Sequence, residues 1–363
     1  MTYLDYQATT PLAPEALAAM LPWLESQYAN PHSAHPPGRA AKAAVEVARG
    51  EVAGLMPEGG TVNFTSGATE ALNWAIKGTT GPIVTLATEH AAVLDTVEAE
   101  ARKGRAVTVL PVGSDGLVDF AAARAAIRPG TGLVAVMLVN NEIGTIQPVE
   151  RLAELARAAG ARFLCDAVQG YGRVLIPEGC DLVAVSAHKV HGPKGVGALW
   201  IREGVTLEPL LHGGGQEPGG RSGTLSPALC AGFGAAARLA KQRFGADHAH
   251  AEQLFRAALA HLGGDWTLNG SRDERYHGNL NIRREGLNVA RLMSDLRDIA
   301  FSAGSACASG SGRPSHVLRA IGLSDAEARS SIRLGLGRYT TEEELLAALD
   351  RITAAARGQK VAA

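Results

Sequence analysis

The chain has 363 residues, of which 46 % are hydrophobic and 20 % charged, and 35 Lys and Arg against 36 Asp and Glu give a formal net charge of −1. This composition is typical of a globular protein with a large core, and the balanced charge without a dense basic run argues against nucleic-acid binding. No apolar stretch is as long as a membrane span, and the N-terminus has neither the basic nor the apolar part of a signal peptide. We therefore expect a cytoplasmic protein that binds no membrane.

The first two thirds of the chain alternate helical and strand patterns. They predict helices over residues 37–55, 71–77, 91–103 and 149–159, and strands over 62–64, 82–87, 106–110, 132–139, 162–166 and 181–186. Such alternation predicts an α/β fold, with a mostly parallel sheet covered by helices on both faces. Ligands of these folds bind at the carboxyl ends of the strands.

The pattern changes near residue 245. A helix over 246–263 is followed by short strands at 279–282 and 332–336 and by helices at 289–298 and 342–356. We predict a large domain over residues 15–245, and a smaller α+β domain formed by residues 1–14 together with residues 246–363.

Lys189 directly follows the apolar strand 181–186 and lies between His188 and His191. Burial at a strand end lowers the pKa of a lysine and makes its amine a nucleophile. An amine of this kind suits a Schiff base with a carbonyl compound, above all with pyridoxal 5′-phosphate (PLP).

Three other segments supply groups that PLP needs. Residues 65–70, small and polar, open the helix 71–77 and predict a phosphate site, although an ordinary N-cap is the alternative. Asp166 ends a strand and suits a partner of the pyridinium nitrogen, or else a helix cap. His90, at another strand end, suits ring stacking or proton transfer, although a lone His is more often structural.

A series of short segments in chain order resembles the cysteine desulfurases of the NifS/IscS type. They lie at residues 65–70, 88–90, 139–144, 166–169, 186–189, 212–217, 221–224, 304–307 and 331–333. The resemblance runs from Leu4 to Glu343, nearly the whole chain. It implies a homodimeric PLP enzyme of fold type I with a seven-stranded sheet. Such an enzyme converts L-cysteine to L-alanine and leaves the sulfur as a protein persulfide.

The resemblance also implies roles for single residues. Lys189 would form the Schiff base, His90 would stack on the ring, Asp166 would pair with its nitrogen and Gln169 would bind its O3′ oxygen. The implied phosphate ligands are Ala68, Thr69, Ser186 and His188, together with Thr224 from the other subunit. Asn140 and Arg333 would hold the α-carboxylate of the substrate, which suits a bidentate Arg–carboxylate pair.

Of the 4 cysteines, Cys165, Cys180 and Cys230 lie in apolar surroundings, and no C-x-x-C pair indicates a metal site. Cys307 instead lies in a run of small polar residues, which predicts a mobile loop with an exposed, reactive thiol. We expect Cys307 to attack the substrate sulfur after Lys189 has removed the α-proton, with His90 moving protons. The loop would then carry the persulfide to an acceptor protein.

Two alternatives stay open at the level of sequence. One is another PLP enzyme of the class V aminotransferase type, such as a selenocysteine lyase, and the other is a non-catalytic sulfur-scaffold protein with the same fold. The acceptor also stays open between iron–sulfur cluster assembly, nitrogenase maturation and tRNA thiolation.

Overall fold

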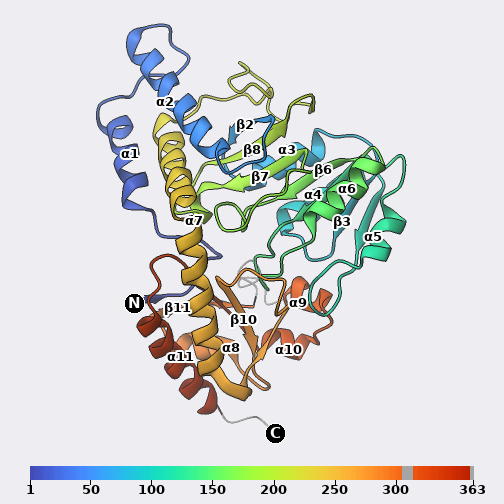
Figure 1. The fold of residues 1–363 in the computed structure, drawn as a ribbon, viewed down its shortest axis with the longest axis vertical. Helices are drawn as coiled ribbons and strands as arrows, with labels where there is room; N and C mark the ends of the chain where they lie inside the picture. The colour runs from blue at the N-terminus through green and yellow to red at the C-terminus, as the bar shows by residue number, and fades with distance from the viewer. Residues whose placement is uncertain (305–313, 360–363) are drawn as a thin grey trace.

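The computed structural model describes residues 1–304 and 314–359 and is built around a seven-stranded sheet (Figure 1). In spatial order its strands are β2 (Gly60–Thr65), β8 (Gly197–Arg202), β7 (Leu182–Ser186), β6 (Arg162–Asp166), β5 (Leu133–Met137), β3 (Ile83–Leu86) and β4 (Val107–Leu110). Neighbouring strands are parallel except around β8, which runs antiparallel to both β7 and β2. The predicted α/β fold with a mostly parallel seven-stranded sheet is confirmed.

Helices cover both faces of this sheet because its strands are apolar on both sides. In β6, Phe163 and Cys165 belong to one hydrophobic cluster, whereas Leu164 belongs to the other. The first cluster is covered by α2 (Pro36–Ala53), α5 (Phe120–Ala126), α6 (Val149–Ala158) and part of α7 (Pro227–Leu262). The second is covered by α3 (Ala68–Lys77) and α4 (Ala91–Arg102). Residues alternate between the two faces as the pleat of a strand requires.

Two elements of the large sheet region depart from the predicted order. The helix α1 (Pro14–Glu25) and the strand β8 have no counterpart among the predicted elements. The strand β8 follows β7 without an intervening long helix, so the alternation of strand and helix that guided the prediction breaks there. The helix α3 already begins at Ala68, which brings Thr69 into its first turn.

A separate hydrophobic cluster joins Leu4 to residues between Leu254 and Ala356. It packs against an antiparallel sheet in the order β12 (Ser302–Ala303), β13 (Ser331–Gly335), β10 (Asn279–Arg283) and β9 (Thr267–Leu268). The pair β1 (Thr2–Tyr3) and β11 (Ile299–Ala300) is parallel. The helices of this part are α8 (Val289–Asp295), α9 (His316–Ala320), α10 (Asp325–Arg329) and α11 (Glu342–Arg357).

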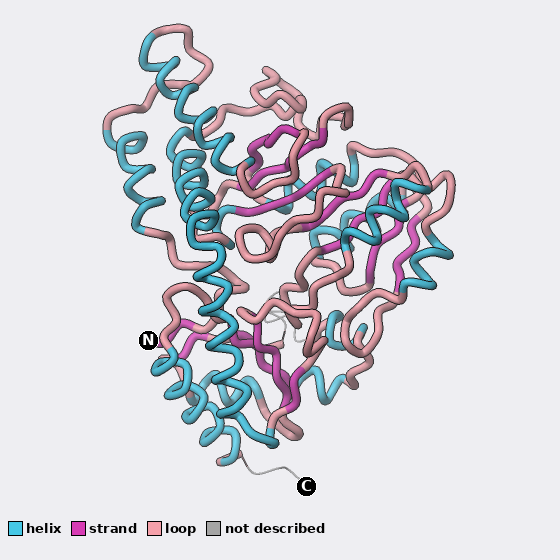
Figure 2. The backbone as a smooth tube through the Cα atoms, viewed as in Figure 1, coloured by secondary structure: helices cyan, strands magenta, loops and turns pink. Residues whose placement is uncertain are grey.

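The helix α7 passes from one core to the other as a single element of 36 residues (Figure 2). It contributes Phe233 to the core of the large sheet and Leu254 to the second cluster. It therefore begins at Pro227 instead of 246, and the predicted boundary at 245 falls inside it. Glycines in the first half of α7 weaken its helical pattern, so the prediction placed the start of the helix too late. Gly234 is needed in the structure because a Cβ at this position would lie 2.7 Å from Ala48 Cα. The division into two domains stays a prediction.

Among the described residues, no helix is both long enough and apolar enough to cross a membrane.

Candidate active site

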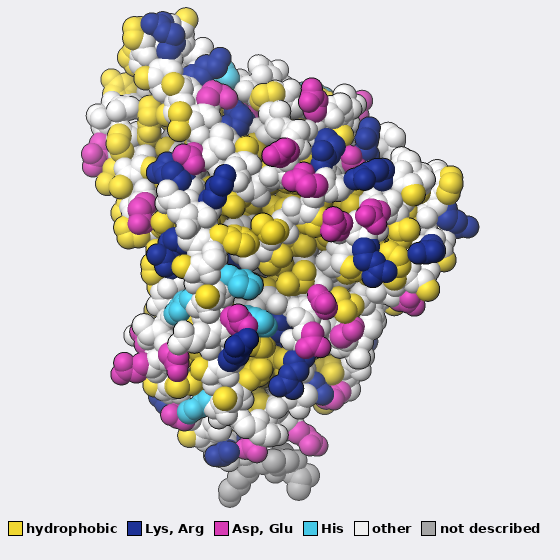
Figure 3. Space-filling model, viewed as in Figure 1, with side chains coloured by type: hydrophobic (Ala, Val, Ile, Leu, Met, Phe, Trp, Pro, Cys, Tyr) yellow, Lys and Arg dark blue, Asp and Glu magenta, His cyan; other side chains and the backbone are white. Residues whose placement is uncertain are grey.

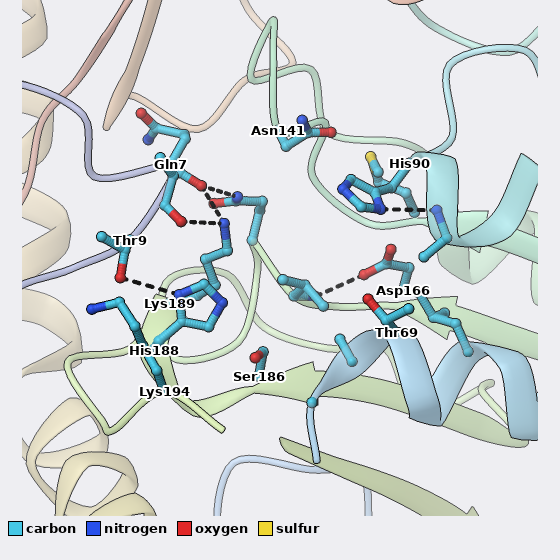
Figure 4. A pocket seen from close by; sticks show the side chains of 18 of the residues that line it. Gln7, Thr9, Thr69, His90, Asn141, Asp166, Ser186, His188, Lys189 and Lys194 are labelled. Carbon is cyan, nitrogen blue, oxygen red and sulfur yellow. Dashed lines mark hydrogen bonds between the residues drawn. The ribbon is translucent and has the colours of Figure 1, made fainter. Parts of the chain in front are cut away.

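The carboxyl ends of the parallel strands meet at a cavity of about 660 Å³ (Figure 4). His90 lies beyond β3, Asp166 ends β6, and Lys189 closes a short 3-10 turn (Ala187–Lys189) after β7. This is the edge at which ligands of open α/β sheets bind. The predicted residues that line the cavity are Ala68, Thr69, His90, Asp166, Gln169, Ser186, His188, Lys189 and Arg333.

The segment of residues 5–10, which we call the N-terminal strap, forms one wall of this cavity. The Lys189 amine donates hydrogen bonds to the carbonyl oxygens of Gln7 and Ala8, the latter at 2.9 Å. The Gln169 amide donates to Gln7 O at 2.9 Å, and Thr9 Oγ1 lies 3.1 Å from His188 Nδ1. Sequence reasoning missed the strap, because main-chain acceptors leave no mark in the residue types.

One end of the cavity is formed by the N-terminus of α3 with Ala68 and Thr69, and Ser186 and His188 line the same cavity (Figure 4). The first N–H groups of a helix have no acceptor within the helix, and the helix dipole adds positive potential there. The adjacent Ser66 N–H is fixed by Glu70 Oε2 at 2.7 Å. This end of the cavity is therefore suited to a phosphate group.

Two buried carboxyl groups lie beneath the cavity. Burial raises the pKa of Asp166 to about 6, although the Val168 N–H and the Lys189 ammonium oppose this shift. Burial also raises the pKa of Glu89 well above its usual range, against the hydrogen bond from Met137 N at 3.0 Å. Of these two groups, Asp166 lines the cavity and Glu89 does not, so Asp166 is the one placed to pair with a cation bound there.

The two histidines of the cavity are held in the neutral form. Burial lowers the pKa of His188 to about 4, helped by the nearby Lys189 and Lys194. Burial, Lys189 and His316 lower the pKa of His90 as well. His90 Nδ1 accepts a hydrogen bond from Ala92 N at 3.0 Å, which leaves the hydrogen of the neutral ring on Nε2. His90 therefore offers a proton donor at Nε2.

The structure corrects the prediction for Asn140. The side chain of Asn140 is buried and donates to Thr88 O at 2.8 Å, while its oxygen accepts the Glu142 N–H at 2.9 Å. The hydrogen bonds of its amide therefore stabilise the loop after β5. Asn141 lines the cavity instead, and its carbonyl oxygen accepts a hydrogen bond from Arg333 Nη1 at 3.0 Å. In a pair of adjacent asparagines, only the turn of the loop decides which one faces the cavity.

Besides Asn140, the predicted residue Thr224 is not among the described residues that line the cavity. Thr224 is exposed on the segment between β8 and α7. Cys307 lies outside the described residues, so its predicted role stays a prediction.

The segment that carries Thr224 is tied to the large sheet by a buried ion pair. The side chain of Glu217 is 0 % exposed. Its carboxylate accepts hydrogen bonds from Arg49 Nη1 at 2.6 Å and from Arg49 Nη2 at 2.9 Å. The same carboxylate accepts Phe64 N at 2.7 Å. Further along, Arg221 pairs with Glu70 at 2.8 Å and so joins the segment to the first turn of α3.

Replacing Arg49 with Met is expected to lower the apparent free energy of unfolding by about 3–5 kcal/mol, because it leaves the buried Glu217 carboxylate without a counter-charge. Arg102→Met is the matched control, since Arg102 pairs with Glu98 on the surface and its loss is expected to cost less than about 1 kcal/mol. Urea unfolding of both variants measures the difference. Equal losses would contradict a structural role for the buried pair.

The chain is similar to known proteins over nearly its whole length. The family model described as aminotransferase class V matches residues 2–347. The chain is 47 % identical to the mitochondrial cysteine desulfurase of Saccharomyces cerevisiae over 359 residues, which is 94 % of this chain and 72 % of that protein. It is 43 % identical to the cysteine desulfurase IscS of Rickettsia bellii over 360 residues, covering 94 % and 88 % of the two chains. A solved NifS-like protein superposes with a TM-score of 0.88 at 33 % identity, covering 97 % of this chain and 98 % of that one.

Proposed function

This chain belongs to the class V aminotransferase family and, within it, to the cysteine desulfurases of the NifS/IscS type, and from this premise we propose the roles of its residues. The proposed reaction converts L-cysteine to L-alanine with PLP as cofactor and passes the sulfur through Cys307. One observation carries the proposal. The Lys189 amine, the Asp166 carboxylate, the N-terminus of α3 and the buried Arg333 all line a single cavity.

The cavity residues fit PLP by their chemistry. A primary amine suits the aldehyde of the cofactor, a buried carboxylate suits its ring nitrogen, and a helix N-terminus suits its phosphate. All three groups line the same cavity (Figure 4). Lys189, Asp166 and Gln169 would hold the ring, and the phosphate ligands would be Ala68, Thr69, Ser186 and His188. When bound, PLP supplies an electron sink that makes the Cα–H bond of an amino acid acidic.

Lys189 Nζ is the proposed base for the substrate α-proton. It lies in the cavity beside the N-terminal strap, whose carbonyl oxygens of Gln7 and Ala8 fix its position. A base held in place in this way removes a proton more efficiently than one that must be oriented first. His90 Nε2 is the proposed group that transfers a proton to or from the substrate thiol.

Arg333 and Asn141 are the proposed contacts of the substrate carboxylate. The Arg333 side chain is 1 % exposed, and its Nη1 is fixed on Asn141 O. A guanidinium that is already oriented binds a carboxylate at a small cost in entropy and so directs the Cα–H bond toward the base.

Cys307 is the proposed nucleophile of the sulfur transfer. Its thiolate attacks the sulfur of the substrate, so that the Cβ–S bond breaks and an S–S bond forms. The released carbon takes up a proton to give L-alanine, and Cys307 keeps the sulfur as a persulfide. No external oxidant is needed, because the reduced carbon of alanine balances the oxidised sulfur.

A homodimer is the proposed working unit, with Thr224 reaching the phosphate of the other subunit. Hydrophobic side chains gather over α1 and α2 (Figure 3), among them Leu17, Leu21 and Leu24, which are 45 %, 40 % and 62 % exposed. A hollow lined by Val45 of α2 and by Gln216 and Leu225 lies between α2 and the segment with Thr224. Exposed apolar faces of this kind mark interaction sites. The acceptor of the persulfide would be a separate protein, such as an iron–sulfur scaffold.

The decisive experiment is a single-turnover assay of the PLP-loaded protein with L-cysteine. The expected products are L-alanine and enzyme-bound sulfur in equal amounts. Formation of pyruvate would contradict the proposal, and conversion of L-selenocysteine without conversion of L-cysteine would favour a selenocysteine lyase.

A further inference from the structure

Asp5 of the N-terminal strap forms an ion pair with Arg333, a residue that lines the cavity. Arg333 Nη2 donates to Asp5 Oδ1 at 2.9 Å and to Ser302 Oγ at 3.2 Å. Ser302 Oγ in turn donates to Asp5 Oδ1 at 2.8 Å. The guanidinium is therefore held from two sides, by Asp5 and Ser302 on one nitrogen and by Asn141 O on the other.

The third nitrogen of the Arg333 guanidinium, Nε, differs from the other two. Within the described part of the chain, Arg333 Nε is buried and has no hydrogen-bond partner. A buried N–H without an acceptor costs free energy, and native structures satisfy nearly all such groups. Arg333 also lines the cavity, and a carboxylate oxygen of a ligand is the acceptor that best matches a guanidinium.

Asp5 and an incoming carboxylate would then share one guanidinium. Without Asp5 the Arg333 cation, whose side chain is 1 % exposed, would be buried without compensation whenever the site is empty. With Asp5 present, a second carboxylate near the same cation is repelled, and the repulsion is strong where the dielectric constant is low. Asp5 thus stabilises the empty site and disfavours the filled one.

Resting on the proposed function, we propose that Asp5 is a built-in counter-ion of Arg333 that limits the affinity of the site for the substrate carboxylate. Asp5 is a positioning residue, because it acts on the substrate through Arg333. The strap also carries the carbonyl oxygens that hold Lys189, so the group that tunes carboxylate binding lies only a few residues from those that place the base.

The test compares PLP-loaded wild-type protein with Asp5→Asn, which removes the charge and keeps an acceptor for Arg333. The probe is 3-mercaptopropionate, which has the thiol and the carboxylate of cysteine but no amine. Its inhibition constant against L-cysteine is expected to fall on the order of fivefold in Asp5→Asn. The inhibition constant of propane-1-thiol, which lacks the carboxylate, is expected to stay unchanged. Asp298→Asn, which removes the surface ion pair with Arg351, serves as the matched control.

Thermal unfolding gives a second readout. Asp5→Asn is expected to unfold at a lower temperature than wild type without ligand and to gain more stability from 3-mercaptopropionate. If Asp5→Asn does not fold, Asp5→Ser replaces it. This variant also removes the charge, so the inhibition constant is again expected to fall.

The result that overturns the proposal is an unchanged or higher inhibition constant in Asp5→Asn, or in Asp5→Ser where that variant replaces it. Failure of the proposed function looks different, because wild-type protein would then form no L-alanine from L-cysteine. Ligand-induced thermal shifts with 3-mercaptopropionate would still compare Asp5→Asn with wild type in that case.

Discussion

Replacement of Lys189 with Ala is expected to lower the rate of L-alanine formation from L-cysteine by a factor of about 10³ or more. The side chain has two tasks in the proposed mechanism, since its amine attaches the cofactor and takes up the α-proton. The neighbouring groups do not replace it. His188 and His90 are neutral and half-buried, and Lys194 lies beside His188 (Figure 4). Product formation and retention of PLP after dialysis measure the two tasks separately.

Lys189→Arg is the matched control for this experiment. A guanidinium keeps the positive charge beside the carbonyl oxygens of Gln7 and Ala8, but it neither attaches the cofactor nor acts as a base near neutral pH. Equal loss of activity in both variants, with unchanged circular dichroism, assigns the effect to the amine. Retention of a tenth or more of wild-type activity in either variant would refute the role of Lys189.

Replacement of Cys307 with Ser is expected to lower sulfide release by roughly a hundredfold or more while leaving the cofactor content unchanged. The hydroxyl is a far weaker nucleophile toward sulfur than a thiolate and forms no persulfide. Sulfide release in the presence of a thiol reductant and mass spectrometry of the intact protein after exposure to L-cysteine measure the effect.

Cys230→Ala is the control for the loss of a thiol. Cys230 is buried in α7, and burial raises the pKa of its thiol to about 12, so it carries no thiolate near neutral pH. This variant is expected to form the persulfide at the wild-type level. Normal sulfide release from Cys307→Ser, or its loss in Cys230→Ala, would place the acceptor thiol elsewhere in the chain.

Much of the fold was predictable because its strands are buried on both faces and therefore appear as short apolar runs. The strands β6 and β7 have the predicted extents within one residue, and the helix α6 ends one residue earlier than expected. The helix α7 was cut short in the prediction because glycines weaken a helical pattern. In the structure Gly234 permits close packing against α2 and Gly232 permits it against Met20 of α1, which no local pattern reveals.

The same contrast holds for the candidate site. Lys189, Asp166 and His90 could be found because each follows an apolar strand, and parallel strands bring their carboxyl ends to one edge. Asn141 could not be separated from Asn140, because that choice depends on the turn after β5. The strap acts through main-chain carbonyl oxygens of Gln7 and Ala8, and any residue types carry those atoms.

The sequence by itself determined the α/β architecture and the chemical groups of the site, because hydrophobic periodicity and reactive side chains are local properties. Only the tertiary structure decided how these groups are held. It joined Asp5 to Arg333 across most of the chain and the strap to Lys189 across about half of it, and it left one nitrogen of Arg333 without an acceptor. Such pairings depend on distances between segments remote in sequence, and these distances are fixed only when the two cores pack against each other through α7.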